Sequence, residues 1–377
     1  MIRVLQRSRS VIPSPAKRQI GLLMRLNRSI AAIGITLLAV SGLAACSSGA
    51  DTPSGQQGAA SPGASASGDC PMPGKVTKAT IATGPGMQDF VVKYVKSAGL
   101  DTKYNLDLDV KSFQNPTATA PAIVQKAVDL GFGGLTTMVQ ARATGADVIV
   151  IGALATANNG VFVKKDSPYH DLKDLKGKRV GSFSPTNGAI GSIVQAYTEK
   201  AYGFNLFSDA DGKVHVAPDA ALLGLMDNNQ LDVAVLGADG SALQRASGKY
   251  RMITDLGKDF PDQFGFAGVY LAPVTTESYA SSHCGEVRAF TSALHDALVE
   301  ITTKPDVWTE YAKAVGQDGK GAAFQNAYTH SLVTSYGPAQ VDGMKKLMEA
   351  ITPYLDPSFP KSVDPALFSL DYLPFDQ

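Results

Sequence analysis

The feature that most constrains the fold is an alternation of short apolar runs with helical segments, which starts at Lys78. Short apolar runs are typical of buried strands, and helical segments of about 10 to 15 residues between them are typical of parallel sheets covered by helices. Strands are expected at 78–81, 106–110, 128–134, 148–151, 179–183, 214–216, 233–236, 251–254 and 269–271. Helices are expected at 90–97, 120–127, 188–202, 220–228, 286–302, 306–314 and 339–351. The alternation therefore predicts an α/β fold.

The length of this region predicts two lobes. About 300 residues follow residue 70, which is more than one ordinary hydrophobic core holds. The predicted division assigns 71–157 to the first part of lobe I, 158–266 to lobe II, and 267–377 to a return to lobe I with C-terminal helices. Two crossings, near 155–161 and 264–272, would form a hinge.

The N-terminal segment has the pattern of an export signal. Seven basic residues and no acidic residue precede Asp51, and an uncharged, mostly apolar run extends from Ile30 to Ala45. This pattern predicts a signal peptide over residues 1–45. An uncleaved membrane anchor is the alternative, and in both cases the rest of the chain would lie outside the cytoplasm. A shorter signal could begin at Met24, so the sequence leaves the start codon open.

The signal ends in Leu43-Ala44-Ala45-Cys46, which resembles the lipobox of bacterial lipoproteins. The resemblance implies that Cys46 is lipidated and that the protein is anchored to the cell membrane on its extracytoplasmic side. Within residues 46–70, the stretch 47–68 consists almost wholly of Ser, Gly, Ala, Pro and Gln. Because such a composition cannot form a core, these residues are expected to form a flexible linker.

Removal of residues 1–45 would change the charge balance. The whole chain has 34 basic and 34 acidic residues, and the removed segment contains seven of the basic ones and none of the acidic ones. The remaining chain then has 27 basic and 34 acidic residues, a net charge of about −7. An acidic body without a run of Lys and Arg argues against nucleic acid as a partner.

Two cysteines remain if Cys46 carries lipid. Cys70 and Cys284 could form a disulfide in an oxidising compartment. They could also be two buried free thiols, and the sequence leaves both alternatives open.

Three segments carry a family resemblance. Residues 122–134, 171–181 and 222–237 resemble the solute-binding proteins of ABC importers, in the nitrate, sulfonate and taurine group that includes proteins for a thiamine pyrimidine precursor. Each segment alone also fits an ordinary strand, turn and helix, but their order together with the lipobox supports the resemblance. It covers roughly residues 75–354 and implies a two-lobed, type II periplasmic-binding-protein-like fold. It also implies a monomer that holds a small polar solute between its lobes, with an ABC permease and a separate cytoplasmic ATPase as partners.

The resemblance and the general behaviour of open sheets place the ligand beyond the carboxyl ends of the strands. The candidates in lobe I are Thr83, Gly84, Met87, Gln88, Gly134, Thr136 and Thr137. The candidates in lobe II are Ser182, Ser184, Thr186, Asn187, Gly188, Gly237 and Asp239. The loop at 184–188 is the most informative, because hydroxyls and backbone N–H groups meet there at the start of a helix and suit an anionic or strongly polar group. The same residues are also common in ordinary caps and turns.

None of these loops contains Arg or Lys, so a sulfonate or nitrate would lack bidentate charge pairing. This absence favours a neutral or zwitterionic ligand. Arg142 and Lys93 lie on nearby helices, where surface positions are expected. Phe90, Phe132 and Phe183 adjoin the loops, and core packing is favoured for each.

Catalysis finds little support in the sequence. The five histidines lack metal-ligand spacing, and no nucleophile elbow, phosphate loop or dinucleotide fingerprint occurs. We therefore predict no metal, no cofactor and no enzymatic activity. Enzymes that make the thiamine pyrimidine share the fold, but they carry a cysteine-rich iron site that has no counterpart in this sequence. A ligand sensor or a surface adhesion protein, which would have no cognate permease, is the remaining alternative.

Overall fold

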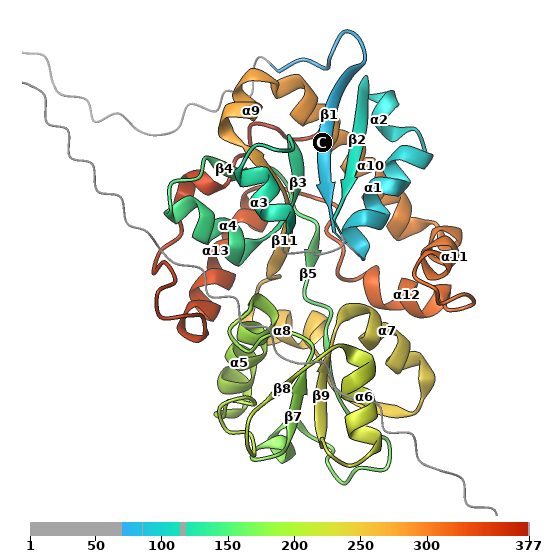
Figure 1. Cartoon of the computed structure of the whole chain (residues 1–377), viewed down its shortest axis with the longest axis vertical. Helices are drawn as coiled ribbons and strands as arrows, with labels where there is room; N and C mark the ends of the chain where they lie inside the picture. Colours follow the sequence, from blue (N-terminus) through green and yellow to red (C-terminus); the bar gives the residue numbers. More distant parts are fainter. Residues whose placement is uncertain (1–69, 85, 114–117, 376–377) are drawn as a thin grey trace, which may run out of the picture. The chain divides into compact units, whose positions relative to one another are not determined.

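The computed structural model describes residues 70–84, 86–113 and 118–375, all of which belong to one compact unit, Pro62–Gln377. The expected signal peptide, Cys46 and nearly all of the expected linker lie outside the described residues. The described chain forms two mixed sheets with helices against them, shown in Figure 1. None of the described helices combines the length and the apolar character that a membrane span requires.

The first sheet has the strand order β2-β1-β3-β11-β4, and β5 pairs with β11. Its strands are β1 (Thr77–Thr83), β2 (Leu106–Ser112), β3 (Leu130–Gly134), β4 (Val148–Val150), β5 (Ala155–Thr156) and β11 (Val269–Thr276). β1 runs parallel to both β2 and β3, whereas β11 is antiparallel to each of its neighbours. We call this sheet and its helices lobe I.

The second sheet has the order β10-β6-β9-β7-β8. Its strands are β6 (Gly160–Lys164), β7 (Val180–Ser182), β8 (His215–Val216), β9 (Val233–Leu236) and β10 (Tyr250–Asp255). β7 is parallel to β8 and β9, but β6 is antiparallel to β9 and β10. We call this sheet and its helices lobe II.

The sequence predicted parallel sheets, but β6 and β11 run antiparallel to their neighbours. Each of them is the first strand after the chain crosses from one sheet to the other. β6 begins beside the end of β9, where Gly160 pairs with Leu236. β11 likewise enters beside the end of β3, where Leu271 pairs with Gly134. A strand that starts where its neighbour ends must run in the opposite direction, so both sheets are mixed.

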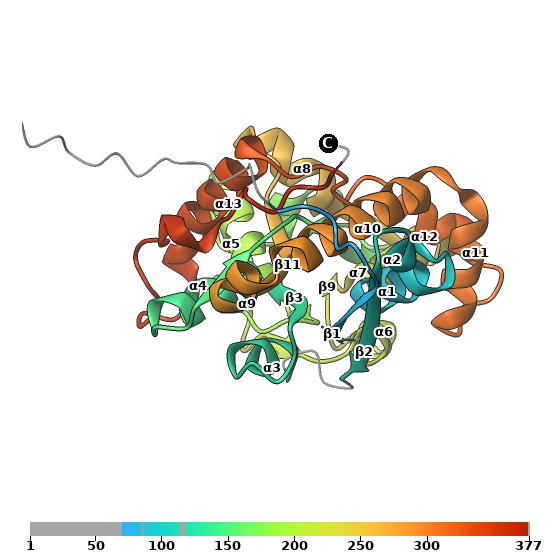
Figure 2. The same ribbon diagram turned by 90° about the horizontal axis from the view of Figure 1, so that it is seen from above.

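The helices cover both sheets. They are α1 (Met87–Ser97), α2 (Leu100–Lys103), α3 (Thr119–Val124), α4 (Leu135–Ala143), α5 (Ala189–Tyr202), α6 (Asp219–Asp227), α7 (Ala238–Ser247), α8 (Leu256–Phe264), α9 (Glu277–Ser282), α10 (Cys284–Thr303), α11 (Pro305–Ala314), α12 (Gly321–Tyr328) and α13 (Pro338–Ile351). α10 lies against α1 and α2 (Figure 2). Its buried face includes Val287, Phe290, Leu294, Leu298 and Ile301, which have the three- and four-residue spacing of an amphipathic helix.

Two helices of lobe II were missed by the sequence analysis. The buried face of α7 consists of Gly240, Ser241 and Ala242, which are too small to produce an apolar periodicity. α8 contains Pro261, which normally argues against a helix interior. α7 therefore depends on tertiary packing, whereas α8 has local end signals that the proline obscured, an Asp255 N-cap and a left-handed Gly265.

The chain passes between the sheets twice, at residues 157–159 and at residues 265–268. Both passages lie within the predicted crossings. In the returning segment, however, α12 contacts α7 and α13 contacts α5, so helices of this segment touch lobe II as well. The predicted lobe boundaries at 157/158 and 266/267 stay predictions.

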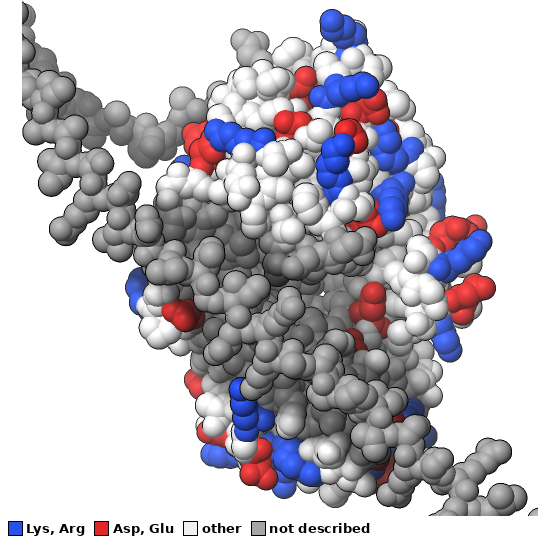
Figure 3. Space-filling view, in the orientation of Figure 1, with Lys and Arg blue, Asp and Glu red and all other residues white. Residues whose placement is uncertain are grey.

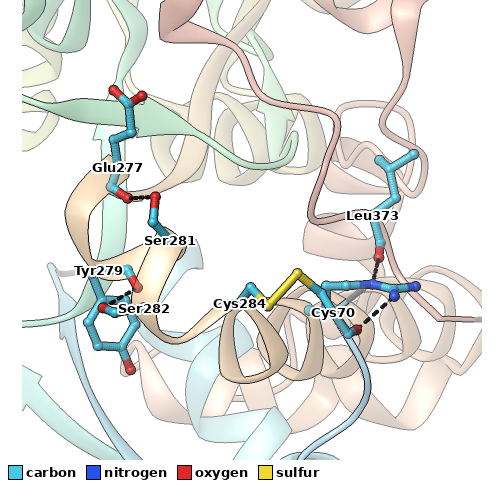
Figure 4. The surroundings of a disulfide bond; sticks show 8 residues. Cys70, Glu277, Tyr279, Ser281, Ser282, Cys284 and Leu373 are labelled. Atoms are coloured by element: carbon cyan, nitrogen blue, oxygen red, sulfur yellow. Dashed lines mark hydrogen bonds between the residues drawn. A yellow bond between two sulfur atoms is a disulfide. The ribbon is translucent and has the colours of Figure 1, made fainter. Parts of the chain in front are cut away.

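A disulfide joins the start of the described body to α10. Cys70 and Cys284 are bonded with their Cα atoms 5.4 Å apart, so the structure selects one of the two alternatives that the sequence left open (Figure 4). Arg288 donates hydrogen bonds to the carbonyl oxygens of Cys70 and Leu373, at 2.9 and 3.1 Å. The disulfide and Arg288 together hold the two ends of the described chain against one helix.

We expect this disulfide to stabilise the body substantially. It closes a loop between residues 214 positions apart, and loops of that length lose much chain entropy on closure. The variants Cys70→Ser and Cys284→Ser should each lower the free energy of unfolding by about 2–4 kcal/mol. Urea unfolding measured by circular dichroism would show this, and a reductant should destabilise the parent but neither variant. Unfolding of both variants at the parent's urea concentration would contradict the expectation.

Candidate functional site

Each sheet brings its two predicted loops to one edge. In the first sheet β1 and β3 are parallel neighbours, so the loops after Thr83 and before Leu135 leave the same edge. In the second sheet β7 and β9 are parallel neighbours, so the loops after Ser182 and Leu236 do the same. The candidate residues are therefore grouped in two pairs of loops, as the carboxyl ends of parallel strands require.

A cavity of about 310 Å³ lies beyond the carboxyl ends of β1 and β2, and we call it the first-lobe cavity. Its wall is formed by Gly84, Gly86, Asp89, Phe90, Lys93, Ser112, Phe113, Tyr311, Ala314 and Val315. Gly84 is one of the predicted site residues. The size is that of pockets that enclose small molecules.

The polar centre of the first-lobe cavity is Asp89, in the first turn of α1. Its Oδ1 accepts hydrogen bonds from the hydroxyls of Thr83 at 2.8 Å and Ser112 at 3.1 Å. Its Oδ2 lies 2.6 Å from the Lys93 ammonium nitrogen. Burial alone would raise the pKa of Asp89, but these three donors outweigh burial and keep the pKa below its ordinary value. The cavity therefore contains an ionised carboxylate, which the sequence analysis did not single out.

Aromatic rings line one side of the same cavity. Phe90 packs edge to face with Tyr311, with the ring centroids 4.8 Å apart. Phe132, by contrast, is fully buried against Phe290, and Phe183 is partly buried. Core packing thus describes Phe132, whereas Phe90 borders the cavity.

Met87 and Gln88 are buried in the first turn of α1. The Gln88 side chain is 8% exposed, and its Oε1 has no hydrogen-bond partner among the described residues. An unpartnered buried oxygen costs about 1–3 kcal/mol. Such a group suits a donor supplied by a ligand.

The N-terminus of α4 also offers polar groups that a ligand could contact. Gly134 is its N-cap and contributes no side-chain cap, while Thr136 and Thr137 are partly exposed and exposed. Arg142 lies at the other end of α4, where it pairs with Glu277 and Asp364. It therefore supplies no cation at the start of this helix.

In lobe II, part of the 182–188 loop is used internally. The buried Ser182 hydroxyl donates to the Ser184 carbonyl at 2.7 Å, and the Thr186 carbonyl accepts from Gln195 at 2.8 Å. Asn187 is exposed, and no side chain caps the start of α5. These contacts give the loop a defined shape and leave the first turn of α5 open to a ligand.

The start of α7, in contrast, is already occupied by a carboxylate of the chain. Asp219 Oδ1 accepts the Gly237 N–H at 2.9 Å. Burial raises the pKa of Asp219 above its ordinary value, and hydrogen bonds from the backbone of Gly237 and Gly240 oppose that effect. Because Asp219 already fills this helix terminus, a ligand anion has no place there.

Asp239, another predicted site residue, is engaged by lobe I helices. Its Oδ1 accepts the hydroxyls of Tyr311 in α11 at 2.8 Å and Tyr328 in α12 at 2.5 Å. Burial raises the pKa of both tyrosines, so the hydroxyls remain protonated donors. Asp239 thus connects α7 of lobe II with the C-terminal helices.

The comparisons with known proteins agree with this architecture. Residues 96–307, more than half of the chain, match the family described as NMT1/THI5-like. The chain belongs to the NMT1/THI5-like family. The match begins in α1 and ends in α11, so it includes the second sheet and both passages. No curated protein matches the chain.

Solved structures share the fold at low identity. A protein of Bordetella bronchiseptica has 20% identity and a TM-score of 0.59, with 78% of this chain and 95% of that one covered. The alkanesulfonate-binding protein SsuA of Xanthomonas axonopodis, bound to MOPS, has 14% identity and a TM-score of 0.59, with 79% and 99% covered. The aliphatic sulphonate binding protein SsuA of Escherichia coli has 14% identity and a TM-score of 0.60, with 75% and 90% covered. The predicted type II periplasmic-binding-protein-like fold is confirmed.

The contact between α6 and α7 of this family member can be tested with two glycines. A Cβ on Gly240 would lie 2.0 Å from Asp219 Oδ2, whereas a Cβ on Gly224 in α6 would meet nothing within 4 Å. We expect Gly240→Ala to lower the free energy of unfolding by about 1–3 kcal/mol, as overpacking does. Gly224→Ala should stabilise the protein by about 0.5–1 kcal/mol, because Ala favours a helix over Gly. Equal melting temperatures for both variants would show that Asp219 does not hold the start of α7.

The tyrosine contacts of Asp239 can be tested by hydroxyl removal. Tyr328→Phe should lower the free energy of unfolding by about 1.5–3 kcal/mol, the value of a hydrogen bond to a charged group. It should also widen the distribution of distances between spin labels placed on α6 and α1. The control is Tyr94→Phe, which removes a hydroxyl bonded at 2.5 Å to Glu300 within lobe I. A distance distribution that changes equally in both variants would contradict an inter-lobe role for Asp239.

Proposed function

We propose that this protein is the extracytoplasmic solute-binding component of an ABC importer. Its membership of the NMT1/THI5-like family and its fold support the proposal. The lipid on Cys46 would hold it at the cell membrane, where the loaded protein would dock on a permease. A separate cytoplasmic ATPase would supply the energy.

The observation that carries the proposal is the first-lobe cavity, which combines an ionised Asp89 with hydroxyls and an aromatic wall. A solute bound in lobe I would gain further contacts when the loops of lobe II approach. Because only the closed form makes both sets of contacts, the solute would favour closure. Gln88 and Asn187 are the side chains that we propose to complete the site.

The charges of the cavity favour a solute with an amino group. The cavity wall contains no arginine among the described residues, and its one lysine, Lys93, already pairs with Asp89. A protonated or amide-like nitrogen of the solute could replace the Lys93 ammonium as the partner of the Asp89 carboxylate, beside the rings of Phe90 and Tyr311. Any anionic end would reach the open starts of α4 and α5. An amino-sulfonate such as taurine, or an aminopyrimidine, meets these requirements better than nitrate.

An enzymatic role is not part of the proposal. Family members that make the thiamine pyrimidine would need thiolates for an iron site, and both cysteines of the described body are used in the disulfide. On the face shown in Figure 3, Lys and Arg lie beside Asp and Glu, which does not favour a nucleic-acid partner. A sensor or adhesion protein on the same fold would lack a cognate permease.

The test is a binding screen of the chain without residues 1–46. Taurine, alkanesulfonates, nitrate and aminopyrimidines are compared by thermal shift, because a ligand of the folded state raises the melting temperature. Hits are then measured by calorimetry. We expect an amine-bearing solute to bind, with Asp89→Asn weakening it at least about tenfold. Gln88→Leu and Asn187→Ala should also weaken it.

The matched control is Asp109→Asn, which removes an exposed carboxylate paired with Lys111 on β2, outside the cavity. Its affinity should equal that of the parent. Unchanged affinity in Asp89→Asn would overturn the site. Failure of every compound to bind a folded protein would favour the sensor or adhesion alternative.

The affinity for an amine-bearing solute should depend on pH through Asp89. The pKa of Asp89 in the folded protein lies below its ordinary value, so the carboxylate is ionised at neutral and mildly acidic pH. The attraction is fully present above the ordinary pKa of about 4 and is lost as the pH falls through the lowered folded value. Calorimetry should therefore show constant affinity between pH 7 and pH 5 and a loss of affinity only below about pH 4.

A further inference from the structure

A second cavity, of about 370 Å³, lies beside the first passage between the sheets, and we call it the hinge cavity. Asn158 of the passage and Arg245 of α7 contribute to its wall. The rest comes from residues within 255–262, at the start of α8, and within 326–331, at the end of α12. It shares no residue with the first-lobe cavity. Its size is enough for a small organic molecule.

Two buried donors of the hinge cavity lack partners. Asn158 is 4% exposed, and its Nδ2 has no hydrogen-bond partner among the described residues. The Nε of Arg245 is also buried and has no partner in the described part of the chain. Buried donors are nearly always bonded, and an unmet one costs about 1–3 kcal/mol. Two unmet donors in the wall of one cavity therefore point to a missing acceptor.

The carboxylate that pairs with Arg245 is not that acceptor. Asp255 pairs with Nη1 of Arg245, and its Oδ1 accepts the Gly257 N–H at 3.1 Å as the N-cap of α8. Its hydrogen bonds hold the guanidinium in place, while the buried Nε keeps no hydrogen-bond partner among the described residues. The rim carries Lys258 and Asp262, both exposed and opposite in charge. Because these rim charges cancel, the two inner donors decide which ligand fits.

We propose that the hinge cavity is a binding site for a small carboxylate, separate from the solute site. One carboxylate accepts two hydrogen bonds in a plane, which matches an amide N–H and a guanidinium Nε–H better than a neutral carbonyl does. The wall contains residues of the passage, of lobe II and of α12. A carboxylate bound there would therefore stabilise one relative position of the lobes. It would change the affinity for the solute, and the solute would change the affinity for the carboxylate by the same factor.

The test follows the two donors directly by nuclear magnetic resonance. The probes are succinate and, as the uncharged match of a carboxylate, acetamide. Adding succinate to the ¹⁵N-labelled chain without residues 1–46 should shift the side-chain signals of Asn158 Nδ2 and Arg245 Nε in a saturable way. Acetamide at the same concentration should leave them unmoved. Equal shifts with both probes, or shifts confined to other residues, would overturn the proposal.

Variants separate the site from general charge effects. Asn158→Asp keeps the shape and replaces the donor by an acceptor, and Arg245→Lys keeps the charge and removes Nε. Each should weaken succinate binding at least about tenfold, and either one suffices if the other does not fold. The control is Asn228→Asp, the same charge change at an exposed position after α6, which should leave binding unchanged. These variants alter no residue of the proposed solute site. Their results therefore test the hinge cavity whatever the outcome of the solute screen.

Discussion

The positions of the hinge and of the candidate site depend on where the chain enters each sheet after crossing from the other. Gly160 pairs with Leu236 at the end of β9, and Leu271 pairs with Gly134 at the end of β3. Each passage between the sheets therefore adjoins the carboxyl ends of parallel strands, where the candidate loops also start. The same backbone pairing that makes the sheets mixed brings the hinge and the candidate site to one edge of each sheet. A rotation at the passages would then move the loops of one lobe relative to those of the other.

The helices that start at that edge differ in whether a carboxylate of the chain lies at their N-terminus. Asp219 occupies the start of α7, and Asp89 lies in the first turn of α1, where Lys93 and two hydroxyls keep it ionised. α4 and α5 have no side-chain cap. The chain thus offers negative charge at one helix and free N–H groups at others, an arrangement that suits a solute with opposite charges at its two ends.

Much of the fold could be predicted from the sequence, because strands such as 233–236 and helices such as α10 have strong apolar patterns. The family resemblance of residues 122–134 and 171–181 is confirmed by the match over 96–307. α7 could not be predicted, since its buried face has only small residues. Asp89 and Asp219 were missed for another reason: an acidic residue in a first helical turn is ordinary, and only its partners mark it as part of a site.

The sequence by itself determined the α/β class, the family and the loops that end the strands, because periodicity and local motifs are properties of neighbouring residues. Only the tertiary structure decided which of those loops are open to a ligand. It paired Asp239 with two tyrosines more than 70 residues away and left Gln88 Oε1 and Asn158 Nδ2 without hydrogen-bond partners among the described residues. Hydrogen bonds between distant segments depend on how the sheets and helices pack, and no local pattern records that packing.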